Sequence, residues 1–523
     1  MEDISAASTI IRELRNSLTP TNLLPLDILL LIPMHLASLS DRLRVTSVCR
    51  HWRRAFLQHA PLWSRLCLTR KTDEHLLTTF LKRAKLSPLD ITLKYSRSPI
   101  PSVALLSPFT EQIRTLFIKN PRLDHMRKPP AIISGPLPLL RTLHVEDNIR
   151  DIGYRSPSTP GPLLFKDAVN VEEFRLYTRN PPLLSQFAFP NLTIFDFRTP
   201  RKLPASLLLN FLGASPSLQE IHIEILNDIK YEAVPTDRVL VLPCVKDFHL
   251  DIANDSFNWE LATHLSCPSA EHARFSRMLR SAPLGDVTPE DIYPPSLSWT
   301  RIIRQYATGT VEQVELELKV GEEPSCSIAF RTSDEATLSL HYHHSIRSGD
   351  RQDATLNAWI GSHLFSRACR VIRDHQLLSN LKYLDIRGGG LLADNLKLTT
   401  SNVGRLLGSM GPLEELVLHE CDLRPYLDPF LETPLFPDAI QPNSFPHITM
   451  LVIDNPVQSL CDNEIYAAAI IKLAKSQHAR ELPFQVMVLP PQVPSWVAEE
   501  LLLSVNTVEC GDDGLVDGDE DRS

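Results

Sequence analysis

Short apolar triplets recur along the chain and predict buried β-strands. In each triplet the apolar residues occupy relative positions 0, 3 and 5, so the last two lie on one side of an extended strand. The first seven triplets begin at positions 86, 113, 140, 171, 192, 218 and 245, and this near-constant spacing indicates a repeated unit. The eleven triplets are Leu86-Leu89-Ile91, Ile113-Leu116-Ile118, Leu140-Leu143-Val145, Val171-Phe174-Leu176, Leu192-Phe195-Phe197, Leu218-Ile221-Ile223, Val245-Phe248-Leu250, Val311-Val314-Leu316, Leu381-Leu384-Ile386, Leu413-Leu416-Leu418 and Ile448-Leu451-Ile453.

Helical segments precede several of these strands. Residues 73–85, 205–213 and 401–410 carry apolar side chains at helical spacing, and proline or glycine separates the last two from the next strand. A unit of roughly 20–29 residues that contains one strand and one helix is typical of leucine-rich repeats. The pattern therefore predicts an α/β fold, in which short parallel strands and helices form an irregular leucine-rich-repeat-like solenoid over residues 69–495.

The array is interrupted at several places. Two long gaps separate Val245 from Val311 and Val311 from Leu381, and either weak repeats or insertions occupy them. Segments rich in proline predict loop insertions at 149–164, 281–298 and 424–446. Residues 484–488 predict a last strand, and the acidic segment 511–523 predicts disorder.

Residues 23–68 have a different pattern, which predicts a small group of helices. Pro25 suits the first turn of a helix that is apolar on nearly every side, and Pro33 ends or bends that helix. A second helix is predicted over 41–58, with Leu43, Val48, Trp52, Ala55 and Phe56 along one face. A short helix that is apolar all round is usually buried or shared with a partner.

The same segment resembles the F-box through Leu24-Pro25, the run Val48-Cys-Arg-His-Trp-Arg53 and Pro61-Leu-Trp63, which follow one another in the family's order. The family usually has a glutamate soon after the Leu-Pro pair, where this chain has Asp27. The resemblance implies that residues 21–68 dock onto the small adaptor subunit of a cullin-RING ubiquitin ligase, after a helical extension at 1–20. The stretch FLKRAKLSPLDITL with the following IRTLFI is also similar to a large group of fungal F-box proteins with irregular leucine-rich repeats. The adaptor contacts implied by the resemblance are Leu24, Pro25, Leu26, Ile28, Leu29, Ile32, Leu43, Val48 and Trp52.

Composition narrows the cellular setting and the partners. The net charge of the 523 residues is −9, and six acids with one arginine in 511–523 carry −5 of it. The rest is close to neutral, so general nucleic-acid binding has no support. The nine cysteines contain no Cys-x-x-Cys pair, and we expect most of them, Cys49 above all, to be buried thiols of a reducing compartment. Prolines and polar residues interrupt the apolar run 23–39, so we expect neither a signal peptide nor a membrane span, and a cytoplasmic and/or nuclear location.

Motifs for catalysis are absent from the sequence. Phosphate-binding, dinucleotide-binding, metalloprotease and nucleophile-elbow patterns do not occur. Gly388-Gly389-Gly390 follows a strand pattern but lacks the spacing of a phosphate-binding loop, and His341, His343 and His344 fit a strand better than a metal site. The sequence thus predicts a non-catalytic protein with no cofactor and no metal.

Eight basic residues and no acid lie between Arg42 and Lys71. A nucleic-acid surface would use such charges, but aromatic residues suited to stacking are few among them. We interpret the run as a solvated helix face, and Trp52 and Trp63 as packing anchors.

The repeat pattern also predicts a binding surface. Strand positions 4 and 6 lie opposite the buried positions 3 and 5, on an open face of mixed charge. Residues read out in this way are the substrate-binding candidates Phe117, Lys119, His144, Arg175, Tyr177, Asp196, Arg198, His222, His249 and Asp385, with Glu146, Glu224, Asp251 and Arg387 beside them. The hypothesis is a substrate receptor whose repeats hold an unknown target protein. The alternatives are a ligase-independent repeat scaffold and an enzyme with its site in 254–310 or 324–380.

Overall fold

The computed structural model describes most of the chain, and the following account concerns those residues only. Among them, no helix combines the length and the apolar character that crossing a bilayer requires. The described residues are 2–18, 24–36, 39–95, 100–119, 135–146, 165, 167–179, 181–201, 203–225, 229–230, 239–253, 260–280, 306, 311–319, 325–333, 335–345, 380–388, 403, 405–419, 423–427, 446–454, 464–491 and 493–510.

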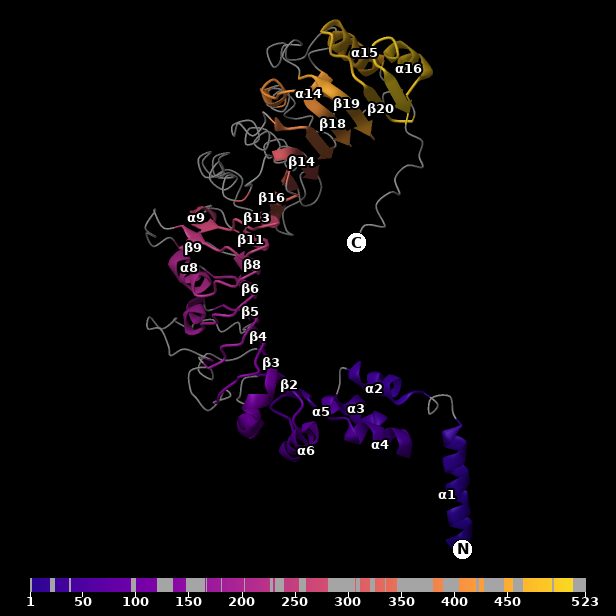
Figure 1. Ribbon diagram of the computed structural model, residues 1–523, viewed down its shortest axis with the longest axis vertical. Coiled ribbons are helices and arrows are strands. Elements are labelled where there is room, and N and C mark those ends of the chain that lie inside the picture. The colour runs from indigo at the N-terminus through magenta and orange to yellow at the C-terminus, as the bar shows by residue number, and fades with distance from the viewer. Residues whose placement is uncertain are drawn as a thin grey trace. The chain divides into compact units, whose positions relative to one another are not determined.

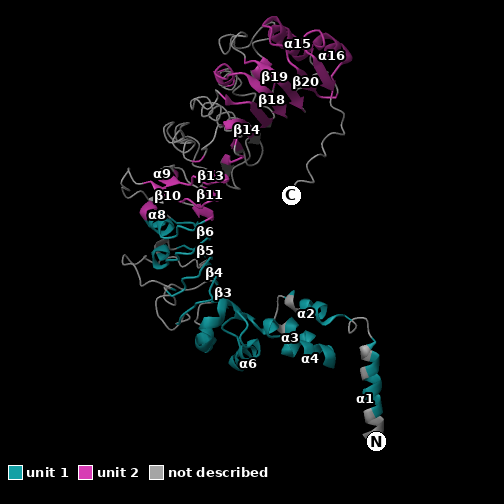
Figure 2. Ribbon diagram, in the orientation of Figure 1, with its two compact units in different colours: residues 1–203, 207–218 teal, residues 204–206, 219–523 magenta. Residues whose placement is uncertain are grey.

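The chain divides into two compact units (Figure 2). Unit 1 comprises residues 1–203 and 207–218, and unit 2 comprises residues 204–206 and 219–523. The loop predictions at 149–164 and 281–298 and the predicted disorder at 511–523 lie outside the described residues.

Unit 1 begins with five helices. Where the sequence predicted a single helix over 41–58, the structure has two shorter ones. The interruption lies at Cys49, whose backbone is extended and whose Sγ accepts a bond from the Trp52 amide at 3.5 Å, as the N-cap of a new helix. Thr46 and Ser47 form the preceding turn, with their hydroxyls bonded to the carbonyls of Leu43 and Arg44. The helices are α1 (Glu2–Ser17), α2 (Leu26–Met34), α3 (Leu39–Val45), α4 (Arg50–Gln58) and α5 (Ala60–Trp63).

Six strands of unit 1 pair in parallel, each with the next one along the chain (Figure 1). The first, β1, was not predicted, and it joins the helical segment directly to the sheet by pairing with β2. These strands are β1 (Arg65–Leu68), β2 (Leu89–Lys94), β3 (Ile113–Lys119), β4 (Thr142–Glu146), β5 (Glu173–Tyr177) and β6 (Ile194–Thr199). Helices α6 (Glu74–Ala84) and α8 (Ala205–Gly213), and 3-10 helices Pro101–Gln112 and Pro181–Gln186, lie between or after them.

Two of the three predicted repeat helices are confirmed. Helix α6 begins after Asp73, whose carboxylate accepts a bond from the Leu76 amide at 2.7 Å, and α8 has the predicted bounds. In the third segment the described residues Val403 and 405–407 are helical.

Unit 2 continues the same parallel pairing on both sides of an antiparallel insertion. The pairs β8–β11, β11–β13 and β13–β16 are parallel, as are the successive pairs β14–β17, β17–β18, β18–β19, β19–β20 and β20–β21. The strands are β8 (Glu220–Ile225), β11 (Asp247–Ala253), β13 (His272–Arg280), β14 (Val311–Lys319), β15 (Ser325–Thr332), β16 (Thr337–Ser345), β17 (Tyr383–Gly388), β18 (Leu413–His419), β19 (Ile448–Asp454), β20 (Val486–Leu489) and β21 (Thr507–Cys510).

Helices and very short strands complete the two units. The long helix α15 follows β19 and precedes β20 along the chain. Most of its buried side chains are small or aliphatic. Strand β21 shows that residues 484–488 do not form the last strand, and α14 shows that the predicted loop 424–446 begins with a helical turn. The remaining elements are β7 (Leu203–Pro204), β9 (Ile229–Lys230), β10 (Leu240–Val241), α9 (Glu260–Thr263), β12 (Leu265–Ser266), α14 (Arg424–Leu427), α15 (Glu464–Ala479) and α16 (Ser495–Leu501).

The triplets predicted the core almost without error. All their members are at most 3% exposed except Leu86, which is 87% exposed. Leu86 follows Lys85, whose positive φ of 53° ends helix α6, so it belongs to a turn rather than to the strand. The buried residues of successive strands therefore form one continuous row in each unit.

One strand in the first gap follows the same rule with smaller side chains. Ala270, Ala273 and Phe275 occupy relative positions 0, 3 and 5 and are 9%, 3% and 0% exposed. The distance in sequence from Val245 to Ala270 matches the interval between the earlier triplets, and the alanines concealed this strand from a search for large apolar residues.

The second gap holds the antiparallel insertion. Strand β15 pairs antiparallel with both β14 and β16, and β16 rather than β14 lies beside β13. The chain therefore enters this meander at its far strand and returns toward β13. Residues 341, 343 and 344 lie on β16, as the strand interpretation of the histidine cluster predicted.

Among the described cysteines, fewer are buried than expected. Six cysteines are described, and all six are free thiols. Only Cys267 and Cys326 are buried, whereas Cys49 is intermediate and the other three are exposed.

Candidate functional site

Helix α2 exposes apolar side chains that its neighbours do not cover. It packs against α3 and α4, and among its residues whose burial is described, Leu29 alone is fully buried. Leu26, Ile28 and Leu31 are 56%, 44% and 53% exposed. Soluble proteins rarely expose several large apolar side chains together unless a partner covers them. We call Leu26, Ile28 and Leu31 the α2 surface.

The expected adaptor contacts divide into exposed and buried residues. Leu29 and Trp52 are 0% and 7% exposed, so they hold the helices together and offer no surface. Trp52 packs edge-on against Phe56 with ring centroids 5.5 Å apart. The others are exposed at Pro25, Leu26, Ile28 and Val48, and half-buried at Leu24, Ile32 and Leu43.

Arg42 departs from the interpretation of the basic run as a solvated face. It is 6% exposed, and its guanidinium donates to the carbonyl oxygens of Leu36, Leu62 and Arg65 at 3.0, 3.4 and 3.1 Å. Burial, and then the nearby Arg65, lower its pKa. Arg42 thus joins α3 to α5 and β1.

The open face of unit 1 carries a row of side chains whose rings contact one another. Strand register places Phe117 beside His144, and their ring centroids lie 4.3 Å apart. His144 in turn contacts the ring of Tyr177 at 5.2 Å, and the Arg198 guanidinium lies over that ring at 4.8 Å. We call Phe117, His144, Tyr177 and Arg198 the aromatic row. It joins β3, β4, β5 and β6 across their open face.

Asp196 anchors this row from below. Its carboxylate accepts a bond from the Tyr177 hydroxyl at 3.0 Å and from Arg198 Nε at 3.1 Å, and it is 8% exposed. Burial, and then the carboxylate of Asp196, raise the pKa of Tyr177, so its hydroxyl stays protonated. Asp196 is therefore a positioning residue rather than the contact residue expected from the sequence.

His144 is neutral in this setting. Burial lowers its pKa, which outweighs the opposite effect of Glu146. Its Nε2 is buried and has no hydrogen-bond partner among the described residues. The remaining candidates on this face are paired, because Lys119 lies 3.1 Å from Glu146 and Arg175 lies 2.6 Å from Glu173.

In unit 2 the same strand positions bring two histidines and an aspartate together. The rings of His222 and His249 stack with centroids 4.5 Å apart and planes at 9°. Asp251 lies on the same face of β11, and its oxygens are 3.7 Å from His222 Nε2 and 3.1 Å from His249 Nε2. All three residues occupy strand positions 4 and 6, which the sequence assigned to the open face, but their clustering was not predicted.

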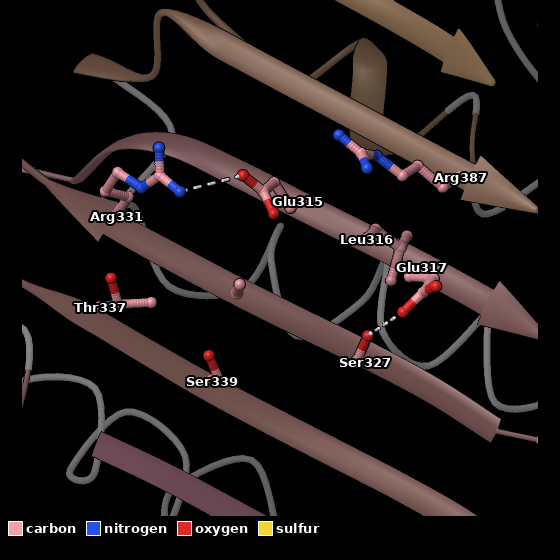
Figure 3. A pocket seen from close by; sticks show the side chains of 9 residues that line it. Glu315, Leu316, Glu317, Ser327, Arg331, Thr337, Ser339 and Arg387 are labelled. Carbon is pink, nitrogen blue, oxygen red and sulfur yellow. Dashed lines mark hydrogen bonds and ion pairs between the residues drawn. The ribbon is translucent and has the colours of Figure 1, made fainter. Parts of the chain in front are cut away.

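A polar hollow of about 300 Å³ lies over the antiparallel insertion and β17 (Figure 3). Glu315 pairs with Arg331 across one wall at 3.5 Å, and Glu317 accepts a bond from Ser327 at 3.2 Å. Arg387 reaches it from β17, where its guanidinium is 2.6 Å from the Asp385 carboxylate.

The residues in and beside this hollow were predicted only in part from the sequence. Asp385, predicted as a contact, is 7% exposed and instead orients Arg387. Glu315 and Glu317 occupy positions 4 and 6 after Val311, so the same rule could have found them. Arg331 could not be found in this way, because β15 runs antiparallel and lies outside the triplet pattern.

The described buried titratable groups are suited to packing rather than to catalysis. Burial raises the pKa of Cys267 and of Cys326 to about 12, and that of Tyr306 well above its usual value. Tyr306 donates its hydroxyl to the Leu265 carbonyl at 3.3 Å. These thiols and this phenol are protonated at neutral pH and enclosed in the core.

Comparison with known proteins identifies the N-terminal segment. Residues 21–69 match the F-box-like family, so the chain carries an F-box-like domain. No curated protein matches the chain.

Proposed function

We propose that this chain is the substrate receptor of a cullin-RING ubiquitin ligase, which docks to the adaptor through the F-box-like domain at 21–69 and binds a target protein with the open face of its strands. The observation that carries the proposal is the combination of that domain with an α2 surface that the chain leaves uncovered.

The adaptor is the occupant that we propose for the α2 surface. Leu26, Ile28 and Leu31 are already about half covered, so burying the rest of each would contribute roughly half of the 1.5–3 kcal/mol expected for a fully exposed side chain. Val48 and Pro25, also exposed, would extend the contact.

The target is proposed to lie on the open face. Parallel strands that follow one another in chain order, with one buried row, support the interpretation of both units as irregular leucine-rich repeats. On this face the aromatic row provides an amphipathic surface, and aromatic and arginine side chains are enriched at the centres of protein interfaces.

Such a receptor performs no bond chemistry. It raises the effective concentration of target lysines near a ubiquitin-loaded conjugating enzyme, which converts a bimolecular encounter into a nearly intramolecular one. A ligase-independent scaffold would use the same surfaces without changing the half-life of its target.

Co-purification of the full chain with recombinant adaptor tests the docking proposal. We expect stoichiometric capture, lost on Ile28→Ser with Leu31→Ser, whose side chains contribute little to the core. Leu502→Ser with Leu503→Ser is the matched control, because these leucines of unit 2 are similarly exposed. The pair Leu24→Ala and Pro25→Ala at the start of α2 is a second docking variant. Equal capture by the wild type and both docking variants would refute the proposal, and so would no capture by the wild type.

A further inference from the structure

The stacked histidines of unit 2 have the arrangement of metal ligands. We propose that His222, His249 and Asp251 form a divalent-metal site selective for Zn²⁺ on the open face of β8 and β11. This site is separate from the adaptor surface, and it does not depend on a ligase role.

Strand register brings the three side chains together. His222 and His249 are directly paired neighbours on β8 and β11, and Asp251 lies two residues further along β11 on the same face. Adjacent strands are about 4.8 Å apart, so paired imidazoles stack and direct their nitrogens the same way. The two histidines belong to different repeats and lie far apart in sequence, so no short motif reveals the site.

The separations suit tetrahedral coordination. With metal–ligand bonds of about 2.0–2.2 Å at the tetrahedral angle, neighbouring ligand atoms have a separation of roughly 3.3–3.6 Å. The nitrogen–oxygen separations of 3.7 and 3.1 Å bracket that value. One ligand atom can be chosen from each of the three residues so that all three atoms lie within 4.8 Å of one another. Small side-chain rotations therefore complete the geometry.

Charge and access also suit a dication. Asp251 supplies the carboxylate of the set, and its oxygens face both imidazoles across the 3.7 and 3.1 Å separations. Its side chain is 29% exposed, and those of His222 and His249 are 30% and 31% exposed, so an ion reaches them from solvent.

Two charged neighbours flank the three ligands. Glu224 pairs in register with Asp251 from β8, and Arg274 pairs with His249 from β13. Their opposite charges offset each other, which leaves the negative charge of Asp251 for the metal. Two imidazoles and one carboxylate favour Zn²⁺ over Mg²⁺, which prefers oxygen ligands. Three protein ligands leave a fourth position for water.

Calorimetric titration of the metal-free full chain with Zn²⁺ tests the site. We expect one tight equivalent that Mg²⁺ does not replace, and that weakens roughly tenfold or more in His249→Ala and in Asp251→Asn. His272→Ala is the matched control, because His272 is an exposed histidine of β13 outside the cluster, and its affinity should equal that of the wild type.

A second readout is independent of affinity. Co²⁺ bound by the wild type should show the visible absorption of tetrahedral coordination, and Asp251→Asn should lose it. Circular dichroism establishes that each variant is folded, and His249→Gln replaces His249→Ala if the latter is not. Absence of tight Zn²⁺ binding by the wild type, or the same affinity in wild type, His249→Gln and Asp251→Asn, would overturn the proposal.

Discussion

Trp63 stacks on Phe80 with ring centroids 5.3 Å apart and planes at 17°. Trp63 is the last residue of α5, within the F-box-like segment, and Phe80 lies on α6, the helix before β2. The indole Nε1 donates to the Phe56 carbonyl at 3.0 Å, and the Arg83 guanidinium lies 4.9 Å from the indole ring. One side chain therefore fixes the F-box-like domain to the first helix of the strand region.

Trp63→Ala should destabilise unit 1 strongly. Removing a fully buried tryptophan leaves a cavity, and such changes cost about 3–5 kcal/mol of unfolding free energy. Trp63→Phe keeps the ring stacking but loses the bond to Phe56, so it should cost less. Hydrogen exchange of α4 and α6 measures both, and unchanged protection in Trp63→Ala would show that the contact does not couple them.

Arg42→Met should also destabilise the F-box-like domain, although methionine fills most of the space. Three carbonyl oxygens lose a charged donor, and bonds to charged groups contribute about 1.5–3 kcal/mol each. Arg44→Met is the control, because that side chain is 80% exposed and pairs only with the neighbouring Asp41. Hydrogen-exchange rates over 39–68 should rise in Arg42→Met alone. Equal rates in both variants would contradict the role of Arg42 in joining α3 to α5 and β1.

Much of the fold was predictable from sequence because the buried row repeats. Ile113, Leu116 and Ile118 are fully buried as their spacing requires, and so are the corresponding residues of β4, β5 and β6. Position 5 of one strand contacts position 5 of the next, so a local rule describes a long-range structure.

The features that sequence missed depend on pairings that no local rule contains. Arg331 faces Glu315 only because β15 turns back against β14. Arg42 resembles its basic neighbours in sequence, and its burial depends on carbonyls of α5 and β1, which lie well beyond its own helix. Asp196 and Asp385 occupy strand positions that the repeat pattern assigns to the open face. Each is nevertheless covered by the arginine two residues later in the chain, which bonds to its carboxylate.

His144 should make unit 1 less stable in mild acid. Its pKa is lowered by burial, an effect that the carboxylates of Glu146, Asp196 and Glu173 oppose and Arg175 reinforces. The unfolded chain therefore binds a proton near the ordinary histidine pKa of about 6.5 that the folded protein resists. Because stability rises with pH where the unfolded state binds more protons, unfolding free energy should fall as pH drops through that value.

His144→Phe keeps a ring beside Phe117 and Tyr177 and removes the titrating group. Hydrogen exchange of β3–β5 at pH 7.5 and 5.5, corrected for intrinsic rates, measures local stability. The loss between these two pH values should be smaller in the variant than in the wild type. A loss of equal size in both proteins would assign the acid sensitivity to other groups of unit 1, such as His59, whose pKa burial also lowers.

Thiol reactivity tests the burial of five cysteines at once. Cys67, Cys244 and Cys510 are exposed and should be alkylated readily by iodoacetamide at pH 8. Cys267 and Cys326 are buried with pKa values of about 12, so almost no thiolate forms and no reagent reaches them in the folded chain. Peptide mapping should show these two modified only after denaturation. Cys326 is the sharper test, because β15 alternates its buried and open residues. A one-residue shift in its pairing would move Cys326 to the open face, and rapid modification of the native protein would then contradict the register of the antiparallel insertion.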